Sequence, residues 1–454
     1  MPYIKINETE TTSYVAFDIT DNTVLIPMLY VRSVAKVDAG GDYLETDVPA
    51  AIEYDSASTF KNDMALGKAT IHGIDARRFA TVDSLYDKSY VMAYELLLQG
   101  MHVVIKPIKF DNLTYWKEDE EVTTGTTNLT FEEYFKILHK AITEENAFEE
   151  FKDRNLFNIK FITTGGYPNA GDIYEYEDEE TKETKYFRST MHTTITDIAQ
   201  ARGDAIALVE LKEDIYDKDT LLAEIEKVDS VGENYKFAAA FTPWAPFTIS
   251  AISTTNEYVM PACFAYLKAF SNSVQSNANW FAASGVSRGY VPDMGIPVLN
   301  IGESLMHVLQ GDPEANTNLN VCFNPIYNAG SYGYRIWGNR VMYQTSTDKK
   351  RKYQDFLNVR ILLCDIRKQV FHAAMRTSFE PNDDIVWINF KTLANTLLDK
   401  MKSGRGISWY SWTKKKATDK ALITATLSIK PIEAVESFDI TVRLTDEDIL
   451  EVEE

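Results

Sequence analysis

One short segment of the sequence has the spacing of a hydrolase nucleophile. Residues 285–289, Gly-Val-Ser-Arg-Gly, follow the pattern Gly-x-Ser-x-Gly, in which a strand before the serine and a helix after it present the hydroxyl at a sharp turn. Residues 277–283 lack the pattern of a buried strand, and Pro292 is incompatible with a helix just after the serine. We therefore predict a tight structural turn, and an α/β hydrolase that uses Ser287 is kept as the enzyme alternative.

Other patterns of catalytic or cofactor-binding residues are missing from the sequence. The six histidines are scattered, with no two at metal-ligand spacing and no His-Glu-x-x-His motif. Neither Gly-x-x-x-x-Gly-Lys-[Ser/Thr] nor Gly-x-Gly-x-x-Gly occurs, so no phosphate-binding loop is recognisable. The acidic run 177–180 lacks the alternating ligands and the glycine of a calcium loop, and we expect a solvated hairpin tip. The sequence therefore predicts no catalytic residue, no metal site and no cofactor.

Composition narrows the class of protein. The 454 residues are 45% hydrophobic, 25% charged and 12% aromatic, values typical of a soluble globular protein with two or three domains and a substantial core. The formal net charge is −21, and so acidic a surface repels phosphate backbones, which argues against a nucleic-acid partner. Cys263, Cys322 and Cys364 form no CxxC pair, and we expect three buried free thiols.

The sequence shows no targeting or membrane-spanning segment. Residues 1–6 lack the apolar core of a signal peptide, and no run of 18 apolar residues occurs. We expect a protein assembled in a cytoplasm, without membrane insertion. Two basic runs, 349–352 and 414–416, stand out against the acidic chain; each is either a solvated face or a docking patch for an acidic protein surface.

The elements that must position these residues alternate between strand and helix patterns in the middle of the chain. Helices are expected at 89–98, 131–151, 192–201 and 220–228, and strands at 23–31, 102–108, 157–164, 205–211 and 237–241. Pro27 is expected at a sheet edge or a bulge, and residues 173–187 are expected to form a tyrosine-rich hairpin. Strands that alternate with helices favour a parallel α/β sheet.

The pattern changes after about residue 320. Two long amphipathic helices are predicted at about 356–376 and 384–402, the second capped by Asn382 or Asp383 and ended by Gly404. Pro381 is expected to end the first helix, because the residue before a proline is pushed out of helical geometry. Strands are expected at 421–429 and around 438–444.

The chain is thus divided into three parts. We predict an N-terminal arm over 1–20, a mixed α/β, sandwich-like body over 21–320 with a possible small insertion near 111–128, and a C-terminal α+β domain over 321–454. The last of these contains the two long helices and ends in an arm at about 441–454.

Several short motifs lie between about residues 235 and 445. No single motif is specific, but their order and spacing together are. The motifs are Phe-Thr-Pro-Trp at 241–244, a Trp/Ala-Gly/Arg-Gly element at 280–289, Asn-Pro-Ile at 324–326, Trp-Gly-Asn-Arg at 337–340, Phe-Glu-Pro-Asn at 379–382 and Ile-Lys-Pro-Ile at 429–432. This set resembles the contractile tail sheath protein family of phage tails, phage-derived bacteriocins and related injection machines. Val341 stands where the family usually has threonine, and Trp409 and Trp412 stand where a more polar segment is expected.

The family resemblance implies structural rather than catalytic roles for the motif residues. These positions are Trp244, Trp280, Arg288, Asn324, Trp337, Arg340, Phe379, Glu380, Pro381 and Asn382. It also implies a subunit, not an enzyme, that polymerises into a helical homo-oligomer around an inner tail tube and contracts to drive the tube through a cell envelope. Expected partners are the tube protein and the baseplate and tail terminator proteins, and the expected location is a phage virion. The sheath of a bacterial contractile injection system is the alternative.

Exchange of terminal arms between neighbouring subunits is a further implication. Isolated strands such as 4–6 and 448–452 are unstable alone, and each could add to the sheet edge of a neighbour. The candidate arm residues are Tyr3, Ile4, Ile6, Ile440, Val442, Leu444, Ile449, Leu450 and Val452.

The helical pair is expected to face the inner tube through releasable polar contacts. The candidate tube-facing residues are Lys400, Lys402, Lys414, Lys415 and Lys416.

Overall fold

The computed structural model describes about two thirds of the chain. The described residues are 22–30, 50–63, 70–71, 74–75, 88–109, 138, 140–144, 146–167, 173–177, 184–188, 191–213, 215–229, 235–249, 257–311, 321–343, 352–415, 423–432 and 434. The predicted arms at 1–20 and 441–454, the insertion near 111–128 and the strand around 438–444 lie outside them.

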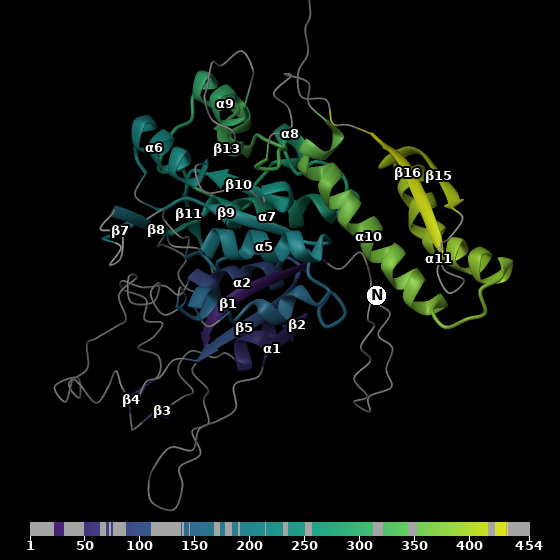
Figure 1. The fold of residues 1–454 in the computed structure, drawn as a ribbon. Coiled ribbons are helices and arrows are strands. Elements are labelled where there is room, and N and C mark those ends of the chain that lie inside the picture. The colour runs from purple at the N-terminus through teal and green to yellow at the C-terminus, as the bar shows by residue number, and fades with distance from the viewer. Residues whose placement is uncertain are drawn as a thin grey trace, which may run out of the picture.

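An eight-stranded sheet forms the centre of the molecule (Figure 1). Its strands are β14 (Tyr334–Ile336), β13 (Phe323–Asn328), β10 (Ala238–Thr242), β9 (Ile206–Glu210), β6 (Phe161–Ile162), β1 (Thr23–Tyr30), β5 (His102–Lys109) and β2 (Ile52–Tyr54), in spatial order. The inner strands are parallel, and β2 and β14 pair antiparallel at the two edges. The predicted parallel α/β sheet and mixed α/β fold class are confirmed.

The position of Pro27 is a correction. Strand β1 lies inside the sheet, paired with β5 along its whole length and with β6 at Val24 and Leu25. The Leu25 carbonyl accepts a hydrogen bond from the Thr163 N–H, which follows β6. Because backbone groups two residues apart in a strand point to the same side, the backbone nitrogen of Pro27 also points toward the β6 side. Pairing with β6 ends before Pro27, so the missing N–H of the proline interrupts no ladder.

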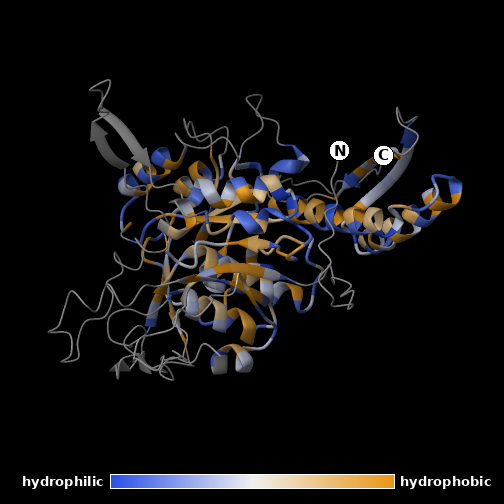
Figure 2. Ribbon diagram, turned by 60° about the horizontal axis from the view of Figure 1, so that its bottom comes forward, coloured by the Kyte–Doolittle hydropathy of each residue, from blue (hydrophilic) through white to orange (hydrophobic). Residues whose placement is uncertain are grey.

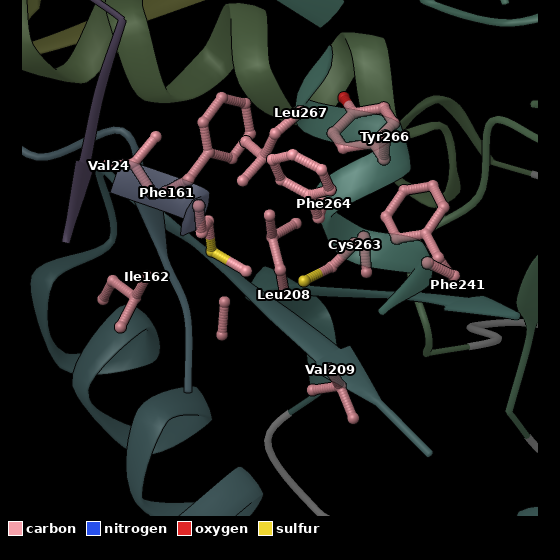
Figure 3. Packing of buried hydrophobic residues seen from close by; sticks show 14 of the residues in the cluster. Val24, Phe161, Ile162, Leu208, Val209, Phe241, Cys263, Phe264, Tyr266 and Leu267 are labelled. Atoms are coloured by element: carbon pink, nitrogen blue, oxygen red, sulfur yellow. The ribbon is translucent and has the colours of Figure 1, made fainter. Parts of the chain in front are cut away.

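Helices cover both faces of the sheet. They are α1 (Ala57–Asp63), α2 (Lys88–Leu98), α5 (Met191–Arg202), α6 (Lys218–Asp229), α7 (Ala262–Val274), α8 (Gly285–Arg288) and α9 (Glu303–Leu309). Strand β9 contacts both α5 and α7, and all of its residues are buried. In Figure 3 the side chains of Leu208 and Phe161 point toward α7, whereas Val209 and Ile162 point away from it. This alternation of apolar side chains on both faces is typical of a sheet buried between helical layers.

Aromatic side chains fill the space under α7. Phe161 packs edge-to-face against Phe270 with centroids 5.1 Å apart, and Phe241 stacks on Tyr266 at 4.2 Å. Burial raises the pKa of the Tyr266 hydroxyl far above its usual value. This is the main core of the protein, and Figure 2 shows apolar residues concentrated along the same strands.

Some predicted elements differ from those observed. A continuous helix through residue 151 is wrong, because Asn146 has a positive φ of 51° and separates a π-helix (Lys140–Glu144) from a 3-10 helix (Glu149–Lys152). The predicted strand 157–164 is regular only over β6. The predicted hairpin is observed as β7 (Ile173–Glu177) paired with β8 (Thr184–Arg188). Strands β11 (Ala245–Thr248) and β12 (Glu257–Met260), and the short pair β3 (Thr70–Ile71) and β4 (Ile74–Asp75), are further antiparallel pairs.

Both long helices are confirmed close to their predicted bounds. Helix α10 spans Leu357–Thr377 and α11 spans Asp384–Ser403, followed by the antiparallel pair β15 (Ile407–Lys415) and β16 (Thr424–Pro431). We call α10, α11, β15 and β16 the C-terminal unit, and the eight-stranded sheet with its helices the body. The division at residue 320 stays a prediction, although β13 and β14 continue the sheet of the body beyond it.

Candidate functional site

The C-terminal unit extends away from the body along α10, so that α11, β15 and β16 lie to one side of it (Figure 1). Its own core is small and comprises Trp280, Leu362, Ile366, Leu397, Leu398, Met401 and Ile407. Tyr410, Trp412, Leu427 and Ile429 of the hairpin pack against this core from one face. The unit is therefore a thin layer of two helices with a two-stranded sheet laid across them.

Buried charges join α10 to the body. The Lys160 ammonium at the start of β6 lies 3.2 Å from the Asp365 carboxylate of α10, and both side chains are 1% exposed. Asn279 donates a hydrogen bond of 2.8 Å to the same carboxylate. Lys368 lies about one helical turn further along α10 and donates to the Ile159 carbonyl at 2.6 Å. Burial lowers the pKa of its ammonium group to about 8. Because such groups are costly to leave unpaired, this contact fixes how α10 sits on the body.

The same junction has an apolar part, which comprises Trp280 and three residues of α10 in the main core, Leu357, Ile361 and Cys364. Trp280 comes from the body, and its indole N–H donates to the Gly404 carbonyl at the end of α11, at 2.9 Å. A Cβ atom at Gly404 would lie 2.6 Å from the Trp280 ring, and one at Gly406 would lie 2.9 Å from it. The two glycines therefore let the turn between α11 and β15 close over the indole.

Asn324 organises the Trp-Gly-Asn-Arg segment. Its side-chain amide donates to the carbonyls of Ala240 and Arg340, and its oxygen accepts from the Arg340 N–H at 2.8 Å. Gly338 packs so closely on Asn324 that a Cβ would lie 2.5 Å from its Oδ1 atom. The Arg340 guanidinium lies over the Phe356 ring at 4.5 Å. These motif residues join the body sheet to the start of α10.

The remaining tryptophan and arginine motif positions also make structural contacts. Trp244 is buried and donates to the Leu211 carbonyl at 2.8 Å. Trp337 is half-buried and stacks at a tilt on Tyr327, with centroids 5.5 Å apart. Arg288 donates to the Ala282 carbonyl at 2.9 Å and lies over Phe281.

The corner between α10 and α11 differs from its prediction in one respect. Helix α10 ends at Thr377, four residues before Pro381, so the proline is not what stops it. Asp383, rather than Asn382, caps α11, since its carboxylate accepts the Ile385 and Val386 N–H groups at 2.8 and 3.0 Å. Phe379 has φ 69°, a conformation that costs a non-glycine residue about 1–3 kcal/mol.

Apolar side chains gather at this corner. Phe379 is 92% exposed, Ile385 65%, Ile388 55% and Met375 37%. We call these four residues the apolar tip. Glu380, Asp383 and Asp384 are exposed in the same segment, as is Arg376 in the last turn of α10. Lys414 pairs with Asp384, so Glu380 and Asp383 are the carboxylates that give the tip its acidic rim. Exposed apolar clusters of this kind are typical of interaction surfaces.

Strand β15 was missed by the sequence analysis. Trp412 packs edge-to-face against Phe390 and Trp387 of α11, with centroids 5.4 and 6.1 Å apart, and its indole donates to Asn395 at 2.9 Å. Tyr410 donates to the Asp399 carboxylate at 2.6 Å, and desolvation together with this bond raises the pKa of the Tyr410 hydroxyl to about 12. The alternation of Tyr410 and Trp412 was the available signal of a strand with one face on a helix.

The tube-facing lysines do not form one patch. Strand β15 runs antiparallel to α11, so that Lys414 lies 3.6 Å from Asp384 at the start of that helix. Lys400 and Lys402 lie in its last turn, and sixteen residues of helix separate Asp384 from Lys400 by about 24 Å. Lys415 is exposed beside Lys414, and Lys416 lies outside the described residues, as do all the candidate arm residues.

The Ser287 segment lacks the geometry of a nucleophile elbow. It forms the single helical turn α8, which corrects the expectation that Pro292 prevents any helix there. Turns and bends, not a strand, precede α8, and in the described part of the chain no hydrogen bond links Ser287 to a histidine or carboxylate.

Polar side chains that are buried or half-buried lie at the carboxyl end of β9 and β10, the edge at which doubly wound α/β proteins bind ligands. Lys88 pairs with Glu213 at 3.2 Å and lies over the Trp244 ring at 4.9 Å. Glu210 contacts the Cys263 thiol, and burial raises the pKa of its carboxyl to about 8.

The described residues contain no group of three or more side chains arranged to hold a metal ion. Among the same residues, no helix is long and apolar enough to cross a membrane. All three cysteines are buried and free.

Comparison with known proteins finds no matching family model and no matching curated protein. Solved structures do match over nearly the whole chain. A chain of the PVC sheath complex, from an extracellular contractile injection system in its contracted state, has a TM-score of 0.55 and 14% identity, covering 98% of both chains. A chain of the contracted anti-feeding prophage baseplate has a TM-score of 0.57 and 13% identity, covering 99% of both. A chain of the six-fold symmetrised baseplate of the same system has a TM-score of 0.54, 13% identity, and coverage of 98% and 99%.

These neighbours define the fold class of the protein. The chain has the fold of subunits from contractile sheath and baseplate complexes, from its first described strand to its C-terminal hairpin. The resemblance inferred from the motifs is therefore confirmed at the level of the fold.

Proposed function

We propose that this protein is the structural subunit of a contractile sheath. Many copies polymerise helically around an inner tube, and contraction drives the tube through a target cell envelope. The observation that supports this most strongly is the match to a sheath-complex chain over 98% of both molecules despite 14% identity. A similarity that spans body and C-terminal unit together argues for a shared architecture, not for one common domain.

The neighbours favour one of the two sheath alternatives. They come from an extracellular contractile injection system and from the anti-feeding prophage, which supports the sheath of a bacterial contractile injection system over that of a phage virion. The proposed partners are further copies of this chain, the inner tube protein, the baseplate and a terminator protein.

We also propose that the terminal arms join neighbouring copies. Within the described residues, β15 and β16 pair only with each other, and a lone two-stranded sheet is marginally stable. Its outer edges offer unpaired backbone groups to a segment such as 4–6 or 440–444 of another copy. Deleting residues 1–8 should then leave a folded, soluble body and prevent stable polymers.

The two lysine groups are candidate contacts to the tube. Because the helix separates them, they are tested independently, by reversing Lys400 and Lys402 in one variant and Lys414 and Lys415 in another. Loss of tube retention at low salt in one variant, with sheath polymerisation intact, would assign the contact to that end of α11. Unchanged retention in both variants would remove the lysines from the tube interface.

Electron microscopy of the purified protein tests the proposal as a whole. Hollow, helically striated rods are expected on concentration or with tube protein. A compact monomer under all such conditions would contradict a sheath role. A Ser287→Ala variant assayed on a panel of esters addresses the enzyme alternative, which would require hydrolysis by the parent chain and its loss in the variant.

A further inference from the structure

The apolar tip requires a partner that its own chain does not provide. Phe379 is almost fully exposed and has a left-handed backbone conformation, which the corner maintains although the ring gains no packing in return. Ile385 and Ile388 continue the apolar surface along the outer side of α11. Such an anchor with Glu380 and Asp383 beside it fits a surface that is aromatic or apolar and basic.

A surface with these properties lies on the body. Tyr332 is 58% exposed in the turn before β14, and Tyr290, which is also exposed, pairs with Arg335 of that strand. The Arg335 guanidinium covers the Tyr290 ring at 4.7 Å, and Arg335 also donates to the Val286 carbonyl of α8. Arg288 follows in the same helical turn. We call Arg288, Tyr290, Tyr332 and Arg335 the tyrosine–arginine patch.

The charges of this patch are not neutralised within the chain. In the described residues, Arg288 and Arg335 contact carbonyl oxygens and aromatic rings, and neither has a carboxylate partner. Glu380 at the tip likewise has no ion pair among the described residues.

The tip and the patch of one chain cannot meet. Helix α10 begins beside Asn339 and Arg340, close to the patch, and the tip follows its last turn. Its 21 residues span about 31 Å. Any contact between the two surfaces must therefore join two copies.

We propose that the apolar tip of one subunit docks on the tyrosine–arginine patch of a second copy of this chain. Copies with a net charge of −21 repel one another, so association needs a local basic surface that receives an acidic one. Two different patches that bind each other make a head-to-tail contact, which repeats as a helical filament when it does not close into a ring. The inference rests on the proposed sheath function and specifies one of its subunit contacts.

Cysteine cross-linking tests this contact. Phe379→Cys and Tyr332→Cys are introduced in separate chains, which are mixed, assembled and treated with a short bismaleimide. The background is low because the three native thiols are buried. A cross-linked dimer is expected in assembled material from the mixture and not from either variant alone. Tyr216→Cys, equally exposed elsewhere on the body, replaces Tyr332→Cys as the matched control.

Two results would overturn the proposal. One is Phe379→Cys cross-linking to itself or to the tube protein, with no product with Tyr332→Cys. The other is cross-linking to Tyr216→Cys as efficiently as to Tyr332→Cys. If rods form without the tip–patch product, the contact is wrong and the sheath function stands; if no rods form at all, the sheath function fails first.

Charge exchange gives an independent measurement. Glu380→Arg and Arg335→Glu should each slow polymerisation on the order of tenfold, and the double variant should recover most of the parent rate. Glu380 is exposed at the tip, so its variant is expected to fold even if Arg335→Glu does not. A parent-like rate for Glu380→Arg at low salt would contradict the docking of the acidic rim.

Discussion

The body and the C-terminal unit are stabilised in different ways. The body is built around a sheet that helices cover on both faces, with Phe161 and Phe241 packed against Tyr266 of α7. The C-terminal unit has a core of seven buried residues, one of which, Trp280, belongs to the body. A layer this thin buries too little apolar surface to be independent. The unit therefore depends on the body, whose core includes Leu357, Ile361 and Cys364 of α10, and, in our proposal, on neighbouring subunits.

The two regions also use polar groups differently. At the junction, Lys160, Asp365 and Lys368 are buried and paired, which fixes orientation but adds little net stability. At the outer end of the unit, carboxylates and lysines are exposed, where ion pairs contribute about 0–1 kcal/mol. Buried charges at the junction keep the C-terminal unit in a fixed orientation on the body. Exposed charges at its outer end can form and break weak contacts with neighbouring subunits, as the proposed function requires.

The largest effect is expected from a cavity in the body. Phe161→Ala removes a fully buried ring that contacts Phe270 and Tyr266, and should lower the free energy of unfolding by about 3–5 kcal/mol. Phe390→Ala, in the half-buried aromatic cluster of the C-terminal unit, is the matched control and should cost less than half as much. Chemical denaturation measures both; equal losses would refute the contrast between the regions.

Breaking the junction should have the next largest effect. Asp365→Ala leaves the Lys160 ammonium buried without its carboxylate, and the expected loss is about 3 kcal/mol. Hydrogen exchange should show α10 and β6 losing protection together. The double variant Lys160→Met with Asp365→Leu removes both charges and should recover most of the stability; a double variant as unstable as the single one would mean that packing, not the unpaired charge, causes the loss.

The body should have a pH dependence that comes from Glu210. Its sign is opposite to that expected from the buried Lys368 of α10, whose lowered pKa of about 8 makes stability rise with pH above that value. Glu210 has a folded-state pKa of about 8, raised by burial from 4.5, so the folded state binds a proton that the unfolded state has lost between these values. The contribution of Glu210 to stability is then greatest below pH 4.5 and falls by about 1.4 kcal/mol per pH unit as pH rises toward 8. The Glu210→Gln variant should lack this slope in thermal melts between pH 5 and 8, and an unchanged slope would mean that the carboxyl is already ionised.

The smallest expected effect concerns the cap of α11. Asp383→Ala removes the acceptor of the Ile385 and Val386 N–H groups and should cost about 1 kcal/mol. Because the tip lies far from the body core, hydrogen exchange should increase in the first turn of α11 and leave the body unchanged. Asp384→Ala serves as the control, since Asp384 is exposed and makes only a long ion pair to Lys414. Loss of protection in β1 or β9 would show that the unit and the body unfold as one.

Much of the fold could be read from periodicity. The strands at 102–108, 205–211 and 237–241 and both long helices are within a few residues of the observed bounds, because their apolar patterns are strong and their ends carry glycine or aspartate signals. The helix at 131–151 and the strand at 157–164 were wrong where the backbone turns at Asn146 and where only two residues of β6 find partners. Strand β15 was not predicted, although Tyr410 and Trp412 alternate as residues on one face of a strand do.

The sequence by itself determined the class of element, the absence of recognisable catalytic motifs and the likeness to contractile sheaths, because these depend on local pattern and composition. Only the tertiary structure decided which residues meet. It placed Pro27 inside the sheet, brought Lys160 and Asp365 together across 205 residues, and separated the lysines of α11 from those of β15 along the length of a helix. It also exposed Phe379 at a corner that the sequence described only as a turn. Contacts between residues far apart in the sequence depend on how helices and strands pack. No local pattern shows that β15 runs antiparallel to α11, which places Lys414 at the start of that helix and far from Lys400.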